Sequence, residues 1–214
     1  MDDSLRLRAR TARVGIKSGA LRGDALKELL LSVPFIDRDV WVDELLGIDE
    51  IPSDMPGLPP ESVPYLPCGV EEVLAVLHGT IRPDDVLVDL GSGLGRVVIL
   101  AHLLAGIRTH GIELQEHLVQ GARARCTELG LDGVTFAHAD ASTCELEGSI
   151  FFLYAPFTGA MLARAIHRLE EIARRRSIVV CAVGLEFHHV PWLRARESPS
   201  VSMAIYDSAS WHVR

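Results

Sequence analysis

The chain has 214 residues, of which 48% are hydrophobic, and it carries a formal net charge of −8. This length suits one domain, with or without an extension, and the acidic balance disfavours a duplex-binding protein, whose surface is normally basic. No apolar run approaches the ~20 residues needed to span a membrane, and residues 1–4 lack a signal-peptide pattern, so we expect a cytoplasmic protein.

The first 67 residues predict a helical extension that ends in a proline-rich connector. Apolar positions at helical spacing predict helices within residues 5–31, where Asp24 is a plausible N-cap for Ala25–Leu31, and another short helix at Asp39–Leu46. Prolines then crowd residues 52–67, which favours extended backbone. We therefore predict an extension and connector at 1–67 and a ligand-binding domain at 68–214. The extension should pack on that domain, either as a lid or as an oligomer contact.

From residue 69 onward, short apolar runs alternate with segments of helical periodicity. This alternation predicts an α/β fold, with a mostly parallel sheet covered by helices on both faces. We expect helices near Val70–Leu77, Val97–Leu104, His117–Leu129 and Ala160–Arg174, and strands at Val86–Leu90, Thr109–Ile112, Val134–His138, Ile150–Leu153 and Ile178–Val183. The tail reads as a terminal antiparallel hairpin of Val201–Asp207 and Trp211–Arg214, joined through residues 208–210. The expected sheet then has seven strands.

The most informative segment is the glycine-rich turn after the first strand, where Asp89 precedes Gly91, Gly93 and Gly95. Glycine lets the backbone turn sharply and lets a ligand approach it closely, and the helix that follows offers free N–H groups. Dinucleotide-binding turns follow the spacing G-x-G-x-x-G, but Arg96 occupies the last glycine position here. A carboxylate beside the turn favours a cationic ligand over a pyrophosphate.

Acidic residues also end the next two strands. Glu113 closes the second strand, where a carboxylate in nucleotide-binding α/β sheets accepts hydrogen bonds from ribose hydroxyls, and Asp140 follows the third. Either one alone would more often be a solvated or capping carboxylate. The signals in this order, with Tyr154 ending the fourth strand, resemble those of class I S-adenosylmethionine-dependent methyltransferases.

The resemblance implies a Rossmann-like, seven-strand domain that binds S-adenosyl-L-methionine. In that family the residue at the position of Asp140 bonds the adenine amino group, and the loop after the fourth strand faces the substrate. The cofactor-binding residues implied by the resemblance are Tyr65, Asp89, Gly91, Ser92, Gly93, Gly95, Glu113, Leu114, Asp140, Ala141 and Tyr154.

A second, more limited resemblance involves the seven-strand protein-lysine methyltransferases and covers about residues 62–157. It is carried by Tyr65-Leu-Pro67, the motif DLGSGLGR at 89–96 and the sequence GIEL at 111–114. In that branch the aromatic residue before the helix encloses the methionine part of the cofactor, which here implies Tyr65. The loop Tyr154-Ala-Pro-Phe157 departs from the branch because it lacks the Asn that serves as acceptor for a target amine.

Methyl transfer from a sulfonium asks little of side chains beyond an aligned nucleophile and a dry site. The catalytic candidates are Tyr154, after the fourth strand, and Glu186, after the fifth. The neighbouring His188 and His189 have no third ligand at metal spacing, and the four cysteines are scattered, so no metal site is predicted.

The sequence therefore predicts a methyltransferase whose acceptor is a protein lysine or a small molecule. The alternatives are a non-catalytic S-adenosylmethionine-binding module, a nucleic-acid methyltransferase and an NAD(P)-dependent oxidoreductase. We expect no membrane partner and consider a nucleic-acid acceptor unlikely, because the chain is acidic overall. Oligomeric state and pathway leave no signature in the sequence.

Overall fold

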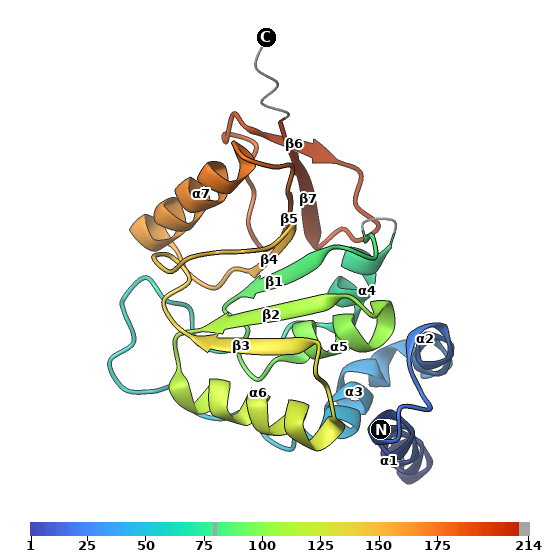
Figure 1. The fold of residues 1–214 in the computed structure, drawn as a ribbon. Helices are drawn as coiled ribbons and strands as arrows, with labels where there is room; N and C mark the ends of the chain where they lie inside the picture. Colours follow the sequence, from blue (N-terminus) through green and yellow to red (C-terminus); the bar gives the residue numbers. More distant parts are fainter. Residues whose placement is uncertain (79–80, 210–214) are drawn as a thin grey trace.

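The computed structural model describes residues 1–78 and 81–209, and these residues form a sheet with helices on both faces (Figure 1). The strands are β1 (Val86–Leu90), β2 (Arg108–Glu113), β3 (Val134–His138), β4 (Ile150–Tyr154), β5 (Val179–Val183), β6 (Leu193–Arg196) and β7 (Met203–Ser208). The helices are α1 (Asp3–Lys17), α2 (Gly23–Leu31), the 3-10 turn η1 (Phe35–Asp37), α3 (Arg38–Leu46), α4 (Val70–Leu77), α5 (Arg96–Ala105), α6 (Glu116–Leu129) and α7 (Gly159–Ala173).

The sheet has seven strands in the order β3-β2-β1-β4-β5-β7-β6. Strands β1 to β5 pair in parallel, whereas β7 runs antiparallel to both β5 and β6. The strand order reverses between β1 and β4, and in open parallel sheets a ligand binds at the carboxyl ends of the strands beside such a reversal. This confirms the expected mostly parallel sheet with a terminal antiparallel pair, and it places the candidate site beyond Leu90 and Tyr154.

Alternate residues of each central strand enter two separate hydrophobic cores. In β4, Phe152 belongs to the core that contains residues of α4, α5 and α6, while Phe151 and Leu153 belong to the core under α7. Successive side chains of a strand point to opposite faces, so a strand buried on both faces is apolar throughout. The helices therefore pack on both faces of the central strands and fix the positions of the strands' carboxyl ends.

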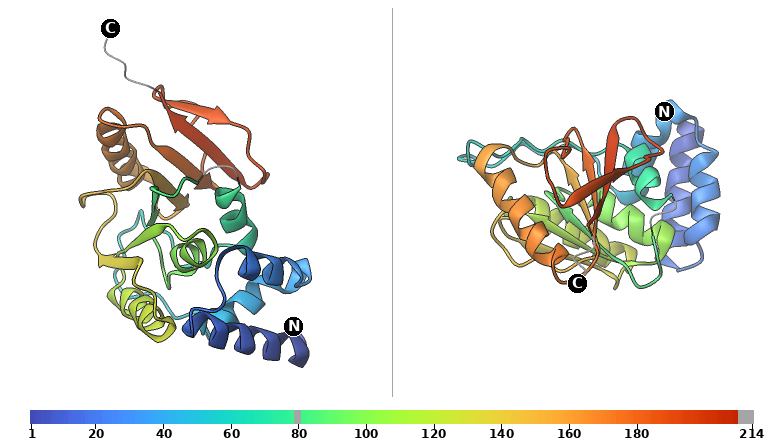
Figure 2. Two further views of the ribbon diagram at one scale, coloured as in Figure 1. Left: turned by 45° about the vertical axis from the view of Figure 1, so that its right-hand side comes forward. Right: turned by 90° about the horizontal axis from the view of Figure 1, so that it is seen from above.

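The N-terminal helices pack as an additional layer outside α5 and α6 (Figure 2). Leu5, Ala9, Ala12 and Ile16 line the buried face of α1 at helical spacing and share one core with α5 and α6. Asp2 caps α1 by accepting the N–H of Leu5, and this sets where the helix begins. Helices α1 to α3 thus brace the sheet from one side.

The proline-rich segment that follows α3 crosses the carboxyl ends of the strands without a helix or strand of its own. We call residues 54–66 the strap. In Figure 1 it is the blue-green loop that swings out beside α6 and α7. An isolated antiparallel bridge joins Ser62 to Phe157, so the strap rests on the loop after β4.

The positions of the central elements agree with the sequence prediction, but two local predictions were wrong. The strand paired with β7 is β6, Leu193–Arg196, which precedes it; of the predicted pair Val201–Asp207 and Trp211–Arg214, the second segment lies outside the described residues. Asp24 is not an N-cap, because α2 begins at Gly23 and Asp24 lies in its first turn. Within the described part of the chain, no helix is both long and apolar enough to cross a membrane.

Candidate active site

The glycine-rich turn lies at the reversal of strand order, between β1 and α5. The N–H groups of Gly91 and Ser92 both donate to the carbonyl of Ile112 in β2, at 2.8 and 3.0 Å. The turn is therefore fixed to β2 and lies at the carboxyl ends of the strands. Because Gly91, Gly93 and Gly95 all have positive φ, an L side chain at any of them would strain the backbone.

The carboxylate of Asp89 is buried beneath this turn. Its side chain is 2% exposed, and no hydrogen bond from another described residue reaches it. Burial raises the pKa of Asp89 well above its usual range, and the negative charge of Glu113 raises it further. A buried carboxylate without a donor is costly to ionise, so this position favours either a proton or a bound cation.

Glu113 joins the ends of β1 and β2. Its Oε2 accepts the backbone N–H of Gly93 at 2.8 Å, and its Oε1 accepts that of Gln115 at 2.9 Å. The side chain is 7% exposed and lines the large cavity described below. Because each carboxylate oxygen has two lone pairs, Glu113 can still accept hydrogen bonds from a ligand hydroxyl.

Asp140 lies in the loop after β3, on the other side of Glu113 from the glycine turn. Its Oδ1 accepts the N–H of Ser142 at 2.8 Å, which orders the loop and leaves Oδ2 free for a ligand. Asp140 lines the same cavity as Glu113, together with its predicted neighbours Leu114 and Ala141. Carboxylates at the ends of adjacent strands thus face one space.

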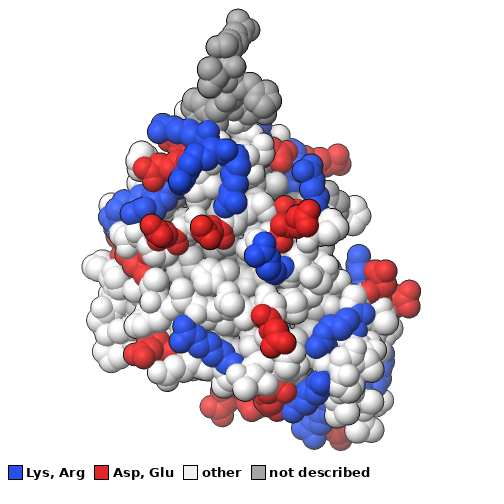
Figure 3. Space-filling model, viewed as in Figure 1, with Lys and Arg blue, Asp and Glu red and all other residues white. Residues whose placement is uncertain are grey.

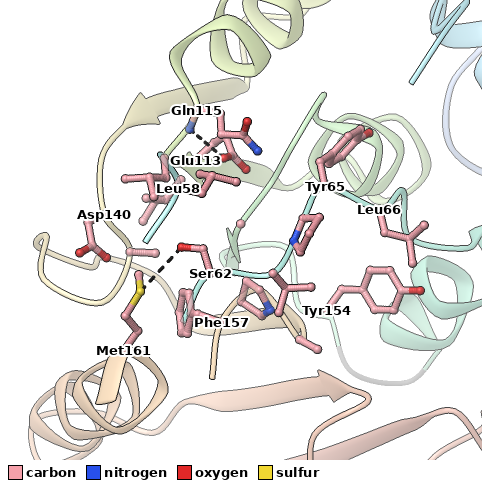
Figure 4. Close-up of a pocket in the computed structure, with 18 of the residues that line it drawn as sticks. Leu58, Ser62, Tyr65, Leu66, Glu113, Gln115, Asp140, Tyr154, Phe157 and Met161 are labelled. Atoms are coloured by element: carbon pink, nitrogen blue, oxygen red, sulfur yellow. Dashed lines mark hydrogen bonds between the residues drawn. The ribbon is translucent and has the colours of Figure 1, made fainter. Parts of the chain in front are cut away.

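Two cavities lie side by side at the carboxyl ends of the strands. The larger encloses about 890 Å³ of space, its open mouth included, and runs from Asp140 and Met161 to Leu66 and Tyr154 (Figure 4). The smaller, of about 280 Å³, lies beside Asp89 and Ser92. Both have walls formed by Tyr65, Leu66, Gly91 and Tyr154.

The strap is held at its two ends and again between them. The ends are joined to each other and to the residue that precedes α6, because Asp54 Oδ1 accepts hydrogen bonds from the Tyr65 N–H at 2.9 Å and from Gln115 Nε2 at 2.7 Å. Between the ends, the Glu61 carboxylate accepts the N–H groups of Ala160 and Met161, at 2.7 and 2.9 Å, in the first turn of α7. The strap therefore forms a roof over the large cavity, held at the start of α6 on one side and at the start of α7 on the other.

Tyr154 ends β4 and is followed by a strained residue. Ala155 has a φ of +38°, a conformation that costs an L-residue about 1–3 kcal/mol and that concentrates at functional sites. Burial raises the pKa of the Tyr154 phenol above its ordinary value near 10, so the hydroxyl is protonated at neutral pH. The hydroxyl is therefore a hydrogen-bond donor, and it points away from Glu113 and Asp140 (Figure 4).

The structure brings most of the predicted cofactor-binding residues to these two cavities. Tyr65, Gly91, Glu113, Leu114, Asp140, Ala141 and Tyr154 line the larger one, and Asp89 and Ser92 line the smaller. Gly93 and Gly95 line neither. A Cβ on Gly93 would meet the ring of Tyr65, and one on Gly95 would meet Phe136 at 2.6 Å. Both glycines permit close packing of the protein's own rings.

The structure does not bring Glu186 to the site. Its side chain is 80% exposed, lies 3.9 Å from His188 and lines neither of the two cavities. Gly184, with a φ of +69°, turns the chain after β5, and Phe187 then anchors it in the core, where its N–H donates to the Tyr206 hydroxyl. The predicted catalytic role of Glu186 is therefore corrected: it is a surface carboxylate.

Several residues that line the large cavity were not predicted from the sequence. Most of them come from the strap, and the others follow β2 and β3 or lie in α7: Leu58, Ser62, Val63, Pro64, Leu66, Gln115, Ala139 and Met161. The crowded prolines signal an extended segment, but nothing local to it shows which edge of the sheet it crosses. Gln115 could have been found, because it follows Glu113 at a strand end.

Sequence comparison relates the central part of the chain to known proteins. Residues 81–152 match the model of a methyltransferase domain family. A stretch of 72 residues is 36% identical to a glutathione S-transferase C-terminal domain-containing protein of Xenopus laevis. That stretch is 33% of this chain, and the chain spans only 12% of that relative's length.

Structural comparison extends the likeness to 66–70% of the chain. An RNA methyltransferase of Salinibacter ruber, solved with S-adenosyl-L-homocysteine, is 25% identical with a TM-score of 0.51, over 70% of this chain and 96% of the other. A putative methyltransferase of Escherichia coli is 20% identical, also with a TM-score of 0.51, over 66% of this chain and 84% of that one. The second likeness concerns the fold alone.

Proposed function

We propose that the chain is a class I S-adenosylmethionine-dependent methyltransferase and that it methylates a small, largely apolar acceptor enclosed beneath the strap. The strap is the observation that carries this proposal. It is bonded to Gln115 on one side and to the start of α7 on the other, and it roofs the cavity where the cofactor and acceptor would meet.

The residues present fit the proposed cofactor. The buried Asp89 carboxylate lacks a donor, which suits the ammonium group of an amino acid. The buried Ser92 hydroxyl has no hydrogen-bond partner in the described structure, so it can serve the same polar end. Glu113 and Asp140 each retain acceptor capacity toward the large cavity, where ribose hydroxyls and an adenine amino group would be donors.

When bound, the cofactor supplies a sulfonium methyl that is already activated for transfer. The protein then has to orient the acceptor about 3 Å from that methyl and exclude water. Tyr154 is the candidate for orientation, because its protonated hydroxyl can donate to an acceptor atom. The strap excludes water by covering the cavity. An acceptor amine or hydroxyl would lose its proton after transfer, and no residue of the described site is assigned as its base.

The walls of the large cavity support an apolar acceptor. Away from Glu113, Gln115 and Asp140, they are formed mainly by apolar side chains: Leu58, Val63, Pro64, Leu66, Pro156, Phe157 and Met161. Specificity in such a pocket comes from shape and from few polar groups. A protein lysine is the other acceptor that the sequence predicts. Its side chain would have to reach past the strap, so we favour a small molecule over a protein lysine.

An RNA acceptor is the second candidate. It is favoured by the Salinibacter ruber relative, which is named an RNA methyltransferase, and by basic side chains that gather over α7 (Figure 3). Arg164 lies within 3.3 Å of the Ser142 hydroxyl, at the rim beside Asp140, and Arg168 follows one turn later. Two like charges four residues apart repel each other weakly, and a phosphate would relieve the repulsion.

Labelled cofactor distinguishes these acceptors. The full chain would be incubated with S-adenosylmethionine carrying a labelled methyl group and an extract separated into small molecules, RNA and protein. We expect label in the small-molecule fraction. Label in RNA, lost steeply with added salt, would replace this proposal by the second candidate. No transfer to any fraction, with S-adenosylhomocysteine still bound, would indicate the non-catalytic module; Asp89→Asn serves as the control that binds poorly.

We further propose that the two parts of the chain have different roles. Residues 68–214 hold the cofactor and the acceptor loop, and residues 1–67 contribute the brace of helices and the strap. The helices do not line the large cavity, whereas the strap does. In this proposal the lid function belongs to the strap alone.

A further inference from the structure

Arg96, at the start of α5, is buried between three segments that are far apart in the sequence. Its Nη2 contacts both oxygens of Asp43 in α3 at 2.5 Å, and its Nη1 donates to the carbonyl of Cys68 at 2.7 Å and lies 3.5 Å from Asp39. The side chain is 5% exposed, and it lines the small cavity beside Asp89. One guanidinium thus joins the glycine turn, helix α3 and the segment that follows the strap.

The ion pair is poorly explained as a source of stability. Burial raises the pKa of Asp43 against the opposing effect of Arg96, and removing two charges from water carries a large desolvation cost. In addition, the buried Nε of Arg96 has no partner in the described structure. Buried pairs of this kind can often be replaced by apolar residues without loss of stability, so a role in geometry is the better explanation.

The geometry that Arg96 enforces is that of the segment Tyr65–Cys68. The Cys68 carbonyl is held by Arg96, and three residues earlier the Tyr65 ring packs over the backbone of Gly93. The Tyr65 N–H is fixed separately by Asp54. The ring is therefore held from both sides against the turn that faces the small cavity, whose other walls include Asp89 and Ser92.

We propose that Arg96 is a positioning residue for the amino-acid end of the cofactor, with Asp43 of the N-terminal brace as its counter-ion. By holding Cys68 it holds Tyr65 over Gly93 and so shapes the small cavity, while the adenosine end of the site depends on Glu113 and Asp140. The N-terminal helices are then part of the cofactor site without touching the cofactor. The inference rests on the assignment of S-adenosylmethionine as cofactor.

Two ligands separate positioning from general support. S-adenosylhomocysteine has the amino-acid end, and methylthioadenosine lacks it. In calorimetric titrations of the full chain, Asp43→Asn should weaken S-adenosylhomocysteine at least tenfold and change methylthioadenosine less than twofold. Glu71→Gln is the matched control. Glu71 pairs at 2.6 Å with Arg38, which lies in α3 as Asp43 does, but Glu71 does not contact Arg96. It should change neither affinity.

The double variant Arg96→Met/Asp43→Leu covers the case in which a single substitution fails to fold. It removes both charges, so its unfolding midpoint in urea should match that of the unaltered chain, while it shows the same selective loss of S-adenosylhomocysteine. Equal weakening of both ligands, or unchanged binding of S-adenosylhomocysteine by a folded variant, would overturn the inference. If the unaltered chain bound neither ligand, the cofactor assignment would fall first, and this inference with it.

Discussion

The carboxylate of Glu113 accepts the backbone N–H of Gly93 at 2.8 Å, so the end of β2 and the turn after β1 form one rigid unit. The same carboxylate accepts the N–H of Gln115, whose side chain holds the strap through Asp54. A single residue therefore connects the glycine turn, the large cavity and its roof. Its replacement should affect both the turn and any ligand that bonds to it.

Glu113→Ala should weaken S-adenosylhomocysteine by about 1–3 kcal/mol, the cost of losing a charged hydrogen-bond partner. Glu113→Gln should lose less, because its amide oxygen can still accept one N–H. Calorimetric titration measures both. The matched control is Glu116→Ala, at the start of α6, whose side chain lies outside both cavities. Unchanged affinity in Glu113→Ala would show that the carboxylate serves only the turn.

Gly93→Ala should destabilise the chain through two separable effects. The left-handed conformation, with a φ of +52°, costs an alanine about 1–2 kcal/mol, and the added Cβ must also displace the Tyr65 ring. Gly106→Ala isolates the first effect, because Gly106 has a φ of +69° and open space around its Cβ position. In urea unfolding, Gly93→Ala should cost more than Gly106→Ala, and the excess should disappear in a Tyr65→Ala background. An excess that persists there would mean that another group opposes the Cβ.

The surroundings of Gly93 include features that the sequence predicts and one that it does not. The glycine turn, Glu113 and Asp140 were predictable because each is set by a strand end and its immediate neighbours. That pattern also suggests that Gly93 makes room for the ligand, whereas the Tyr65 ring occupies the space directly above it. The ring comes from 28 residues earlier in the chain, and its position depends on Asp54 and Arg96.

The terminal antiparallel pair was predicted, but the partner of β7 was missed for a different physical reason. Strand β6 lies at the edge of the sheet, and its residues Arg194 and Arg196 give it a charged pattern unlike that of a buried strand. Edge strands often carry such charges, which discourage pairing with other chains. The composition of β6 therefore resembles that of a loop, and its pairing with β7 could not be predicted from the sequence. The path of the strap is hidden in a similar way, since it depends on contacts with Gln115 and α7.

Cofactor binding should depend on pH through Asp89. Burial and the charge of Glu113 raise its pKa in the free chain, so at low pH it is neutral and must lose a proton before it can pair with an ammonium group. Affinity for S-adenosylhomocysteine should therefore rise as the pH approaches the raised pKa of Asp89 in the free chain and level off above it. The slope is at most about tenfold per pH unit for one proton. Titrations in two buffers of different ionisation enthalpy should detect the released proton.

The stability of the free chain should depend on pH in the opposite direction to its ligand affinity. A carboxyl group whose folded pKa is raised favours the folded state when protonated, so its contribution is lost as the pH rises from the unfolded value to the folded one. Asp89→Asn removes this contribution. Relative to that variant, the unaltered chain should lose stability with rising pH while its ligand affinity rises. Parallel pH profiles for the two proteins, in both stability and affinity, would rule out Asp89 as the group responsible.

Glu61→Ala should loosen the strap without disturbing the glycine turn. The Glu61 carboxylate accepts two N–H groups in the first turn of α7, and the loss of such a cap costs about 0.5–2 kcal/mol. With that contact released, residues 54–66 should be cut faster by a protease, and S-adenosylhomocysteine should slow the cut in the unaltered chain. Glu50→Ala, an exposed site outside the strap, is the control. Because the roof, and not Glu113, is altered, turnover should fall more than cofactor affinity; an equal fall in both would mean that the strap holds the cofactor itself.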